Sequence, residues 1–267
     1  MLLLFDIGNT NTHIGLANSR KVIRQTNVPT KDWNTGRAAK AVSNFVRSSA
    51  IEGAALCSVV PKMTLPVAQF ASQRFKAPVL ELTAHNSIVG IDYPKPRTIG
   101  PDRLANAIAV KHHYGAPAVV VDFGTAVTFD VVNQKGDYVG GIIAPGLNVM
   151  TDYLHEKTAL LPSIKIRETN AVIGKNTEQA MLIGAVHGYR GLIRNLISEL
   201  KQQLKARRLP VVATGGYAEL ISAKIPEITE VDPLLTLEGL RLLWEAHVCC
   251  SCCHGGEPPC ALRDGDL

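Results

Sequence analysis

The chain has 267 residues, enough for one large domain or for two lobes that each bury a core. Hydrophobic residues make up 46% of the sequence and charged residues 19%, a balance that excludes a disordered chain. The formal net charge of +5 is modest and aromatic residues make up only 5%, so the composition suits small anions and argues against nucleic acid as a partner.

Neither a membrane nor an oxidising compartment is indicated by the sequence. No apolar run approaches the ~20 residues that a membrane-spanning helix requires. The apolar start MLLLF has no basic segment before it and is interrupted by Asp6, so it does not predict a signal peptide. Five of the six cysteines fall in the last nineteen residues instead of being spread through the fold. We therefore expect a cytoplasmic protein with no membrane partner.

The first half of the chain, residues 1–115, predicts a sheet covered by helices. The opening predicts a strand, a tight polar turn and two more strands, carried by LLLFDIGNTNTHIGLAN and KVIRQTNVP. Two further strands are predicted at GAALCSVVP and APVLELT. Two helices are predicted from apolar spacing near 3.6, at TGRAAKAVSNFVRSS and PDRLANAIAVKHHYG.

The second half, residues 116–248, predicts elements in a similar order. A strand, a turn and two more strands are expected within AVVVDFGTAVTFDVVNQKGDYVGGIIAPG. One long helix is predicted at NTEQAMLIGAVHGYRGLIRNLISELKQQLK, then a strand at LPVVATGG and a closing helix at LTLEGLRLLWEAH. Residues 249–267 form a Cys-rich tail.

The two halves begin with the same turn. An Asp-x-Gly turn follows a buried strand at Asp6 and again at Asp122, 116 residues later. Either turn alone is common in hairpins. Together they predict a duplicated α/β lobe whose two equivalent turns share one phosphate-containing ligand in a cleft between the halves.

The residue types in both turns suit phosphate. Gly8 and Gly124 allow a ligand to approach the backbone closely. Polar groups are offered in the same turns by Asn9, Thr10, Asn11, Thr12 and Thr125. The adjacent carboxylate, Asp6 or Asp122, can hold a cation that neutralises phosphate charge. The chain contains neither G-x-x-x-x-G-K-[ST] nor G-x-G-x-x-G, so a P-loop is excluded and a dinucleotide fold is unsupported.

Six motifs, taken together in their order and spacing, resemble the type III pantothenate kinases. These motifs are DIGNT, GPDR, DFGTA, GGIIAPG, NTEQAMLIGAVHGYRG and TGG. The resemblance extends from Met1 to about Val248. It implies an α/β fold of two tandem RNase H-like lobes, as in actin-like ATPases, with the nucleotide cleft between them. The Asp-x-Gly turns are general to this superfamily, whereas IDYPKP followed by GPDR is much more specific.

The resemblance implies an enzyme that transfers the γ-phosphate of ATP to pantothenate, the first step of coenzyme A biosynthesis. It implies Mg²⁺ with ATP, a monovalent cation (K⁺ or NH₄⁺) and a homodimer. It also implies three sets of site residues. The ATP contacts are Asp6, Ile7, Gly8, Asn9, Thr10, Asn11, Thr12, His13 and Thr125, with Asp6 near Mg²⁺. The pantothenate contacts are Tyr93, Gly100, Pro101, Asp102, Arg103 and Thr177, with Asp102 as the catalytic base. The monovalent cation is held by Asp122.

The residues agree with these implied roles on chemical grounds. Phosphoryl transfer has a loose transition state, so positioning and charge neutralisation provide most of the catalysis. Asp102 can orient a hydroxyl and accept its proton late, although an aspartate of ordinary pKa, near ~4, is a weak base. Arg103 can pair with a carboxylate or a phosphate oxygen. An aspartate in the first turn of a helix is also favoured by the helix dipole, and both roles can hold together.

Three other functions remain open at this point. A non-catalytic transcriptional accessory factor of the same fold is disfavoured, because the sequence shows no helix-turn-helix and no basic aromatic groove. A superfamily kinase acting on a sugar or sugar acid cannot be excluded by the fold. An actin-like filament former is disfavoured by the short chain.

The Cys-rich tail departs from the family pattern. Cysteines 249, 250, 252 and 253 with His254 could bind a soft metal such as zinc. Their spacing has no partner pair at a loop-forming distance, so we expect a disordered segment instead.

Overall fold

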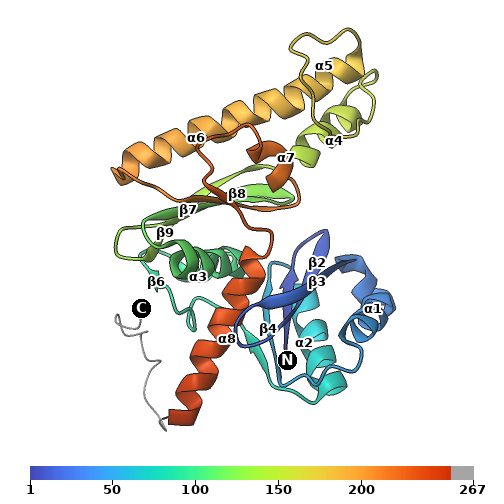
Figure 1. The fold of residues 1–267 in the computed structure, drawn as a ribbon. Coiled ribbons are helices and arrows are strands. Elements are labelled where there is room, and N and C mark those ends of the chain that lie inside the picture. Colours follow the sequence, from blue (N-terminus) through green and yellow to red (C-terminus); the bar gives the residue numbers. More distant parts are fainter. Residues whose placement is uncertain (254–267) are drawn as a thin grey trace. The chain divides into compact units, whose positions relative to one another are not determined.

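Two sheets with the same strand order form the framework of the chain, shown in a computed structural model that describes residues 1–253, with side chains as far as Val248 (Figure 1). The chain divides into two units. The first comprises residues 1–113 together with the chain from Leu234 onward, and the second comprises residues 114–233. Each unit contains one of the two sheets. No helix in the described part of the chain is long and apolar enough to cross a lipid bilayer.

The first unit holds a sheet of order β3-β2-β1-β4-β5. Its strands are β1 (Leu2–Ile7), β2 (Asn11–Ala17), β3 (Val22–Pro29), β4 (Gly53–Ser58) and β5 (Val79–Glu81), followed by the two-residue β6 (Gly90–Ile91). Its helices are α1 (Arg37–Val46), α2 (Pro61–Phe75), α3 (Pro101–Tyr114) and α8 (Leu235–Cys253), with short 3-10 helices at Thr30–Thr35 and Pro96–Thr98.

The second unit repeats this topology in its five strands as β9-β8-β7-β10-β11, within a six-stranded sheet that also includes β6. Its strands are β7 (Ala118–Phe123), β8 (Ala126–Val132), β9 (Asp137–Pro145), β10 (Val211–Gly215) and β11 (Glu230–Val231). Its helices are α4 (Leu147–Lys157), α5 (Thr177–Ile183), α6 (Tyr189–Leu204) and α7 (Ala218–Ser222), with a π-helical turn at Gly184–Gly188 between α5 and α6.

The duplication extends to individual positions. β1 and β7 have the same sequence of buried and half-buried residues, and so do β2 and β8. Both hairpins are antiparallel, and both second strands carry a β-bulge at the equivalent position, Leu16/Ala17 and Val131/Val132. The turn between the strands is one residue longer in the first hairpin. The predicted internal repeat is therefore confirmed in the strands, register and bulges.

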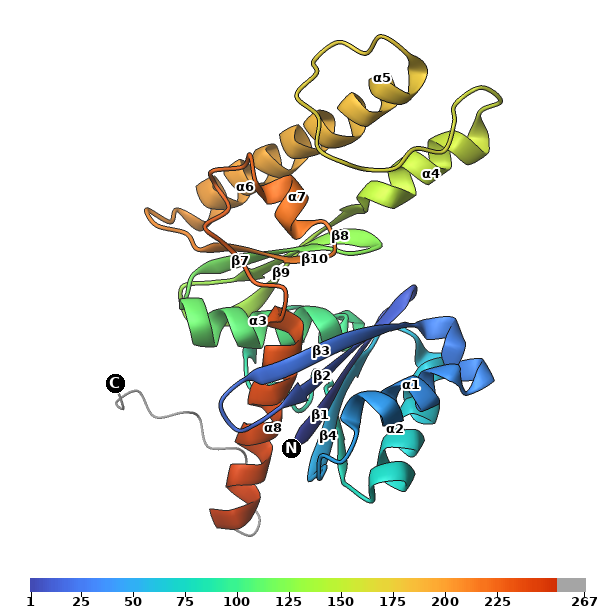
Figure 2. The ribbon, with the colours of Figure 1, turned by 45° about the vertical axis from the view of Figure 1, so that its right-hand side comes forward.

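Helices cover the sheet of each unit. In the first unit, α1 and α2 cover one face of the β1–β4 sheet and α8 lies on the other (Figure 2). Helix α8 packs closely there: a Cβ at Gly53 would lie 2.0 Å from the Trp244 ring, and one at Gly239 would lie 2.0 Å from the Ala105 carbonyl oxygen. In the second unit, α6 and α7 bury the face formed by Val119, Val121 and Phe129.

The observed elements add to the predicted ones in several places. Helix α2 was not predicted, because Pro66 lies inside it and only Val67 and Ala71 are buried, so its apolar period is weak. Helices α4 and α7 were also missed. The single helix predicted from Asn176 onward is interrupted by the π turn. Helix α8, which the sequence assigned to the second half, groups with the first unit and continues to Cys253, past the predicted end of the fold at Val248. The rest of the predicted tail, residues 254–267, lies outside the described residues.

Candidate active site

Asp6 is the next-to-last residue of the buried strand β1. The residues before it in β1, from Leu3 to Phe5, are wholly excluded from water. Cys57 lies opposite Asp6 on the parallel neighbour β4, and its Sγ donates to Asp6 Oδ1 at 3.4 Å. Burial and the nearby charge of Asp102 raise the pKa of Asp6 to about 7, against the lowering effect of the Cys57 hydrogen bond. The Asp102 carboxylate is therefore near enough to disfavour the ionised form of Asp6.

Asp102 lies in the first turn of α3. Pro101 occupies the first helical position, and the Gly100 carbonyl accepts from the backbone N–H groups of Arg103 and Leu104 at 3.0 and 3.3 Å. The Asp102 carboxylate turns back over Gly100, where a Cβ would lie 2.4 Å from Asp102 Oδ1. Burial raises the pKa of Asp102, while the Arg103 N–H and guanidinium oppose this rise. Glycine at position 100 thus leaves room for the carboxylate.

Internal hydrogen bonds hold the turn after Asp6 in place. Gly8 N–H donates to the Asn11 carbonyl at 3.0 Å, and the Thr30 hydroxyl donates to the Gly8 carbonyl at 2.7 Å. The Thr12 hydroxyl is fully buried, 3.0 Å from that of Thr30, and accepts from the Trp33 indole at 3.1 Å. This network supports the turn by internal bonds and leaves the residues at its tip, Asn9 and Thr10, exposed to solvent.

The predicted ATP contacts of this turn therefore differ in whether their side chains can reach a ligand. Asn9 and Thr10 present side chains to solvent. Ile7 and Thr12 are buried and can face a ligand only through the backbone. His13 Nδ1 lies 2.8 Å from Asn27 Oδ1 on the neighbouring strand.

The second Asp-x-Gly turn is built against two glycines of its own unit. Gly215, which has a φ of +90°, lies so close that a Cβ would be 2.6 Å from Asp122 Oδ1. Gly146 N–H donates to the Thr125 carbonyl at 3.1 Å, and a Cβ on Gly146 would lie 2.2 Å from that oxygen. The Thr-Gly-Gly segment and the second turn, far apart in sequence, thus meet around Asp122. Gly124 and Thr125 are exposed at the tip of the turn.

The other two predicted pantothenate contacts, Tyr93 and Thr177, belong to other segments of the chain than the two Asp-x-Gly turns. Tyr93 is 37% exposed, in the segment between β6 and the second 3-10 helix. Thr177 is the first residue of α5, where the Asn176 side chain caps the helix by accepting from the Gln179 N–H. Thr177 also lines a mostly apolar cavity of about 340 Å³ between α4 and α5, together with Met150, Thr151, Leu154, Leu161, Ala180, Met181, Gly184 and Ala185.

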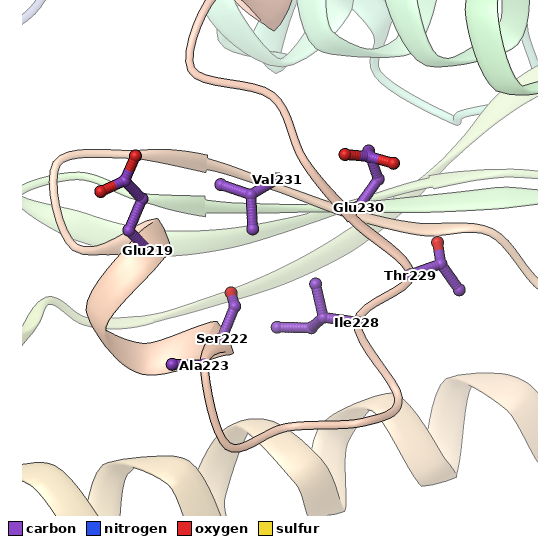
Figure 3. Close-up of a pocket in the computed structure, with 7 residues that line it drawn as sticks. All are labelled: Glu219, Ser222, Ala223, Ile228, Thr229, Glu230 and Val231. Atoms are coloured by element: carbon purple, nitrogen blue, oxygen red, sulfur yellow. The ribbon is translucent and has the colours of Figure 1, made fainter.

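A second hollow lies beside α7 and β11, with a volume of about 380 Å³ (Figure 3). Its walls include Glu219, Ser222 and Glu230, and none of the predicted site residues lines it. The Ser222 hydroxyl is buried and has no hydrogen-bond partner among the described residues. Helix α7 follows directly from the Gly215–Gly216 turn, so this hollow adjoins the Thr-Gly-Gly segment.

Sequence reasoning missed two contributors to the site. Cys57 was not among the predicted site residues, but its thiol donates to Asp6. Gly146 was noted only as part of a motif, although the second turn depends on its missing side chain. The pairing of β1 with β4, which places Cys57 opposite Asp6, is a long-range contact that no local pattern signals. Among the described residues, no group of three or more His, Cys, Asp or Glu side chains is arranged to hold a metal ion.

Comparison with known proteins identifies the family. The family model for type III pantothenate kinase matches residues 2–199. The type III pantothenate kinase of Akkermansia muciniphila is 46% identical over 242 residues, covering 90% of this chain and 96% of the relative. That of Methylacidiphilum infernorum is 43% identical over 246 residues, covering 91% and 88%. The chain belongs to the type III pantothenate kinase family. It is accordingly a phosphotransferase of a family that uses ATP with a divalent metal.

Solved structures confirm the fold class. A putative 2-dehydro-3-deoxygalactonokinase from Sinorhizobium meliloti matches with a TM-score of 0.59 at 12% identity, covering 92% of this chain and 96% of the other. A conserved putative Baf family transcriptional activator from Campylobacter jejuni matches with a TM-score of 0.56 at 18% identity, covering 92% and 98%. At these identities the likeness concerns the fold alone, an α/β architecture with two sheets of RNase H-like order.

The raised pKa of Asp6 predicts a stability gain for Asp6→Asn that grows with pH. The unfolded carboxyl ionises near pH 4 and the folded one near 7, so wild-type stability falls as the pH rises through this interval. Asn removes this penalty, and its melting temperature should exceed the wild-type value by a margin that widens, on the order of several degrees, from pH 5 to pH 8. Thermal unfolding in the presence of a chelator measures this margin.

The control is Glu199→Gln, which neutralises an exposed carboxyl of α6. Its effect should stay nearly constant across the same interval. A margin for Asp6→Asn that is equal at pH 5 and pH 8 would contradict the raised pKa.

Proposed function

We propose that the protein transfers the γ-phosphoryl group of ATP directly, in line, to the primary hydroxyl of pantothenate, giving 4′-phosphopantothenate and ADP in the first step of coenzyme A biosynthesis. One observation carries the proposal beyond family membership: Asp6 at the end of β1 and Asp102 at the start of α3 are close enough for the charge of one to raise the pKa of the other. A kinase needs one carboxylate for the metal of ATP and one for the acceptor hydroxyl.

Asp6 and the turn after it form the ATP end of the proposed site. Asn9, Thr10 and Asn11 offer polar groups to the phosphates, with Thr125 contributing from the second turn. Asp6 would hold Mg²⁺, which binds through few carboxylates together with phosphate oxygens and water and which would neutralise charge on the phosphates. This preference fits the Asp6 carboxylate beside the turn proposed to bind the phosphates. A bound cation would also favour the ionised form of Asp6.

Asp102 acts as the base in this proposal. The hydroxyl oxygen of pantothenate forms a bond to the γ-phosphorus while the bond to the leaving oxygen of ADP breaks, and the hydroxyl proton passes to Asp102. Because burial raises the pKa of Asp102, its carboxylate accepts a proton more readily near neutral pH than an ordinary aspartate does. The positive end of the α3 dipole lies at the start of the helix and stabilises the ionised form of Asp102.

Pantothenate is held by the residues around Asp102 together with Tyr93 and Thr177. Arg103 is placed to pair with its carboxylate, and Gly100 and Pro101 fix the start of α3 so that Asp102 faces the hydroxyl. Asp122, over Gly215, would hold the monovalent cation. A single carboxylate suits a cation of low charge such as K⁺ or NH₄⁺.

A homodimer is also part of the proposal. Several large apolar side chains are exposed on α4 and the segment that follows it: Tyr153, Leu154, Leu160, Val172 and Ile173. Leu160 is 89% exposed, which is costly for an apolar side chain in a monomer. These residues adjoin Thr177, so a second copy covering them would lie next to a pantothenate contact. A cytoplasmic location fits the buried free thiol of Cys57.

Two alternatives are tested by the same assays. A kinase for a sugar or sugar acid would use the same carboxylates, and the fold is shared with such enzymes. A non-catalytic accessory factor would have no use for a carboxylate pair, so the presence of both Asp6 and Asp102 favours an enzyme.

The first test is ADP release from Mg-ATP by the purified protein, in potassium and in sodium. We expect release that requires pantothenate, that sugars and sugar acids do not support, and that falls at least tenfold in sodium. Asp122→Asn should remove most of the difference between the two salts. Folded protein that binds ATP but releases no ADP with pantothenate in either salt would refute the substrate assignment.

Asp102→Asn should reduce turnover by about 10²- to 10⁴-fold, because the amide cannot accept the proton. ATP affinity measured by calorimetry should stay within about threefold of wild type. Glu199→Gln serves as the matched carboxyl-to-amide control and should leave both quantities unchanged. Near-normal turnover in Asp102→Asn would show that Asp102 is not the catalytic base.

Leu160→Glu should weaken the homodimer, since it places a charge on the apolar surface of α4 and the following segment. Sedimentation velocity should show a dimer for wild type at micromolar concentration and a larger monomer fraction for the variant. Leu65→Glu, a matched change at an exposed leucine of α2, should not alter the assembly. A wild-type protein that sediments as a monomer would contradict this part of the proposal.

A further inference from the structure

The chain between α4 and α5, residues 158–176, has no regular secondary structure yet leads directly into Thr177. Irregular segments of this length in compact proteins are usually functional or disordered. This one is held by side-chain bonds along its course, which favours a functional segment. We refer to residues 158–176 as the α4–α5 segment.

Glu168 is the main attachment point of the α4–α5 segment. Its carboxylate accepts two parallel bonds from Arg190, from Nη1 at 3.1 Å and from Nη2 at 2.7 Å. Lys224 Nζ lies 3.3 Å from the same carboxylate and donates to Asn170 Oδ1 at 2.7 Å. The hydrogen bonds from Arg190 hold the pKa of Glu168 down at about 2, so the carboxylate stays ionised at any physiological pH.

Arg190 itself is fixed from its other side. It is 6% exposed, and besides Glu168 it donates to the carbonyls of Ile221 (Nε, 3.2 Å) and Leu220 (Nη2, 2.6 Å). These carbonyls belong to the last turn of α7, where a helix leaves such groups without partners of its own. Helix α7 follows the Gly215–Gly216 turn. One guanidinium therefore connects the helix after Gly215–Gly216 with the segment before Thr177.

The π turn at Gly184–Gly188 sets the directions in which the side chains of His187 and Arg190 leave the helix. An added residue in a helix rotates everything after it by about 100° relative to what precedes it. His187, within the turn, places Nε2 2.9 Å from the Thr169 carbonyl, and Arg190 follows at the start of α6. Two consecutive residues of the α4–α5 segment, Glu168 and Thr169, are thus held from one short stretch of helix.

The remainder of the α4–α5 segment is held to α5. Arg167 Nη1 lies 3.2 Å from Glu178 Oε1 in the first turn of α5. Gly174 lies so close to α5 that a Cβ would be 2.6 Å from the backbone of Ala180. A shift of the chain at Glu168 therefore passes to the residues that set the position of Thr177.

We propose that Arg190 and Glu168 are positioning residues for the acceptor substrate: their ion pair holds the α4–α5 segment in the conformation that presents Thr177 to pantothenate. The inference rests on the proposed function, because it assigns Thr177 to the pantothenate site. Neither residue touches the reacting atoms. Loss of the ion pair should weaken pantothenate binding and leave the chemical step and ATP binding nearly unchanged.

The test compares Glu168→Ala with Glu227→Ala. Glu227 accepts a similar forked pair from Arg194, one turn further along α6, at 3.0 and 2.9 Å, but it does not contact the α4–α5 segment. We expect Glu168→Ala to raise the KM for pantothenate roughly tenfold, with kcat and the KM for ATP within about twofold of wild type. Glu227→Ala should leave all three quantities within about twofold. Glu168→Gln, which keeps a hydrogen-bond acceptor, should give an intermediate KM.

Limited trypsin digestion gives a readout that does not depend on activity. Lys165, Arg167 and Lys175 lie in the α4–α5 segment and supply cleavage sites there. Cleavage at these sites should be at least about fivefold faster in Glu168→Ala than in wild type or Glu227→Ala, since release of the segment exposes its backbone.

The outcomes separate this inference from the proposed function. Wild-type protein without pantothenate-dependent turnover would overturn both. Normal wild-type turnover with an unchanged KM for pantothenate in Glu168→Ala would overturn the positioning role alone, whatever the digestion shows. Equal increases in the KM values for pantothenate and ATP would also overturn it, because the effect would then not be specific to the acceptor.

Discussion

A carboxylate placed at the end of a buried strand is the constraint on which the site depends. The residues of β1 before Asp6 are excluded from water, so the strand cannot shift without exposing them, and the carboxylate is held where its ionisation is unfavourable. A cation or a proton relieves this cost. The same placement recurs at Asp122 after β7, whose burial pattern matches that of β1. Two equivalent Asp-x-Gly turns thus follow from one structural unit used twice.

The duplicated hairpins have diverged where their proposed roles differ. The first turn is one residue longer and is supported by the hydrogen bonds of Thr12, Thr30 and Trp33. The second turn is packed against Gly146 and Gly215. On the strand beside each carboxylate, Cys57 stands opposite Asp6 and Thr214 stands opposite Asp122. The architecture fixes two equivalent positions, and local substitutions give each its own chemistry.

The sequence predicted the strands around the two Asp-x-Gly turns well, because alternation, glycine and strand length all agree there. It predicted the start of α3 from Pro101 and Asp102, whereas the role of Asp102 as a base came from the family resemblance and stays a prediction. It failed at α2, where Pro66 and a weak apolar period hide a helix, and at the π turn, which no residue pattern distinguishes from regular helix. It could not identify the partners of Arg190, because contacts to Glu168 and to the carbonyls of Leu220 and Ile221 depend on tertiary structure. Local residue patterns determine where helices and strands form, whereas contacts between distant parts of the chain determine which side chains meet.

The division of the chain has a consequence for the order of folding. The second unit is one continuous stretch, residues 114–233, and a hydrogen bond of 3.2 Å between Tyr114 Oη and Asp232 Oδ2 joins its two ends. The first unit is discontinuous, and α8, which packs against Gly53 and Ala105, is made last. During synthesis the second unit can complete its sheet while β1 and β4 still lack their covering helix. The strand that carries Asp6 therefore reaches its final packing only after α8 has left the ribosome.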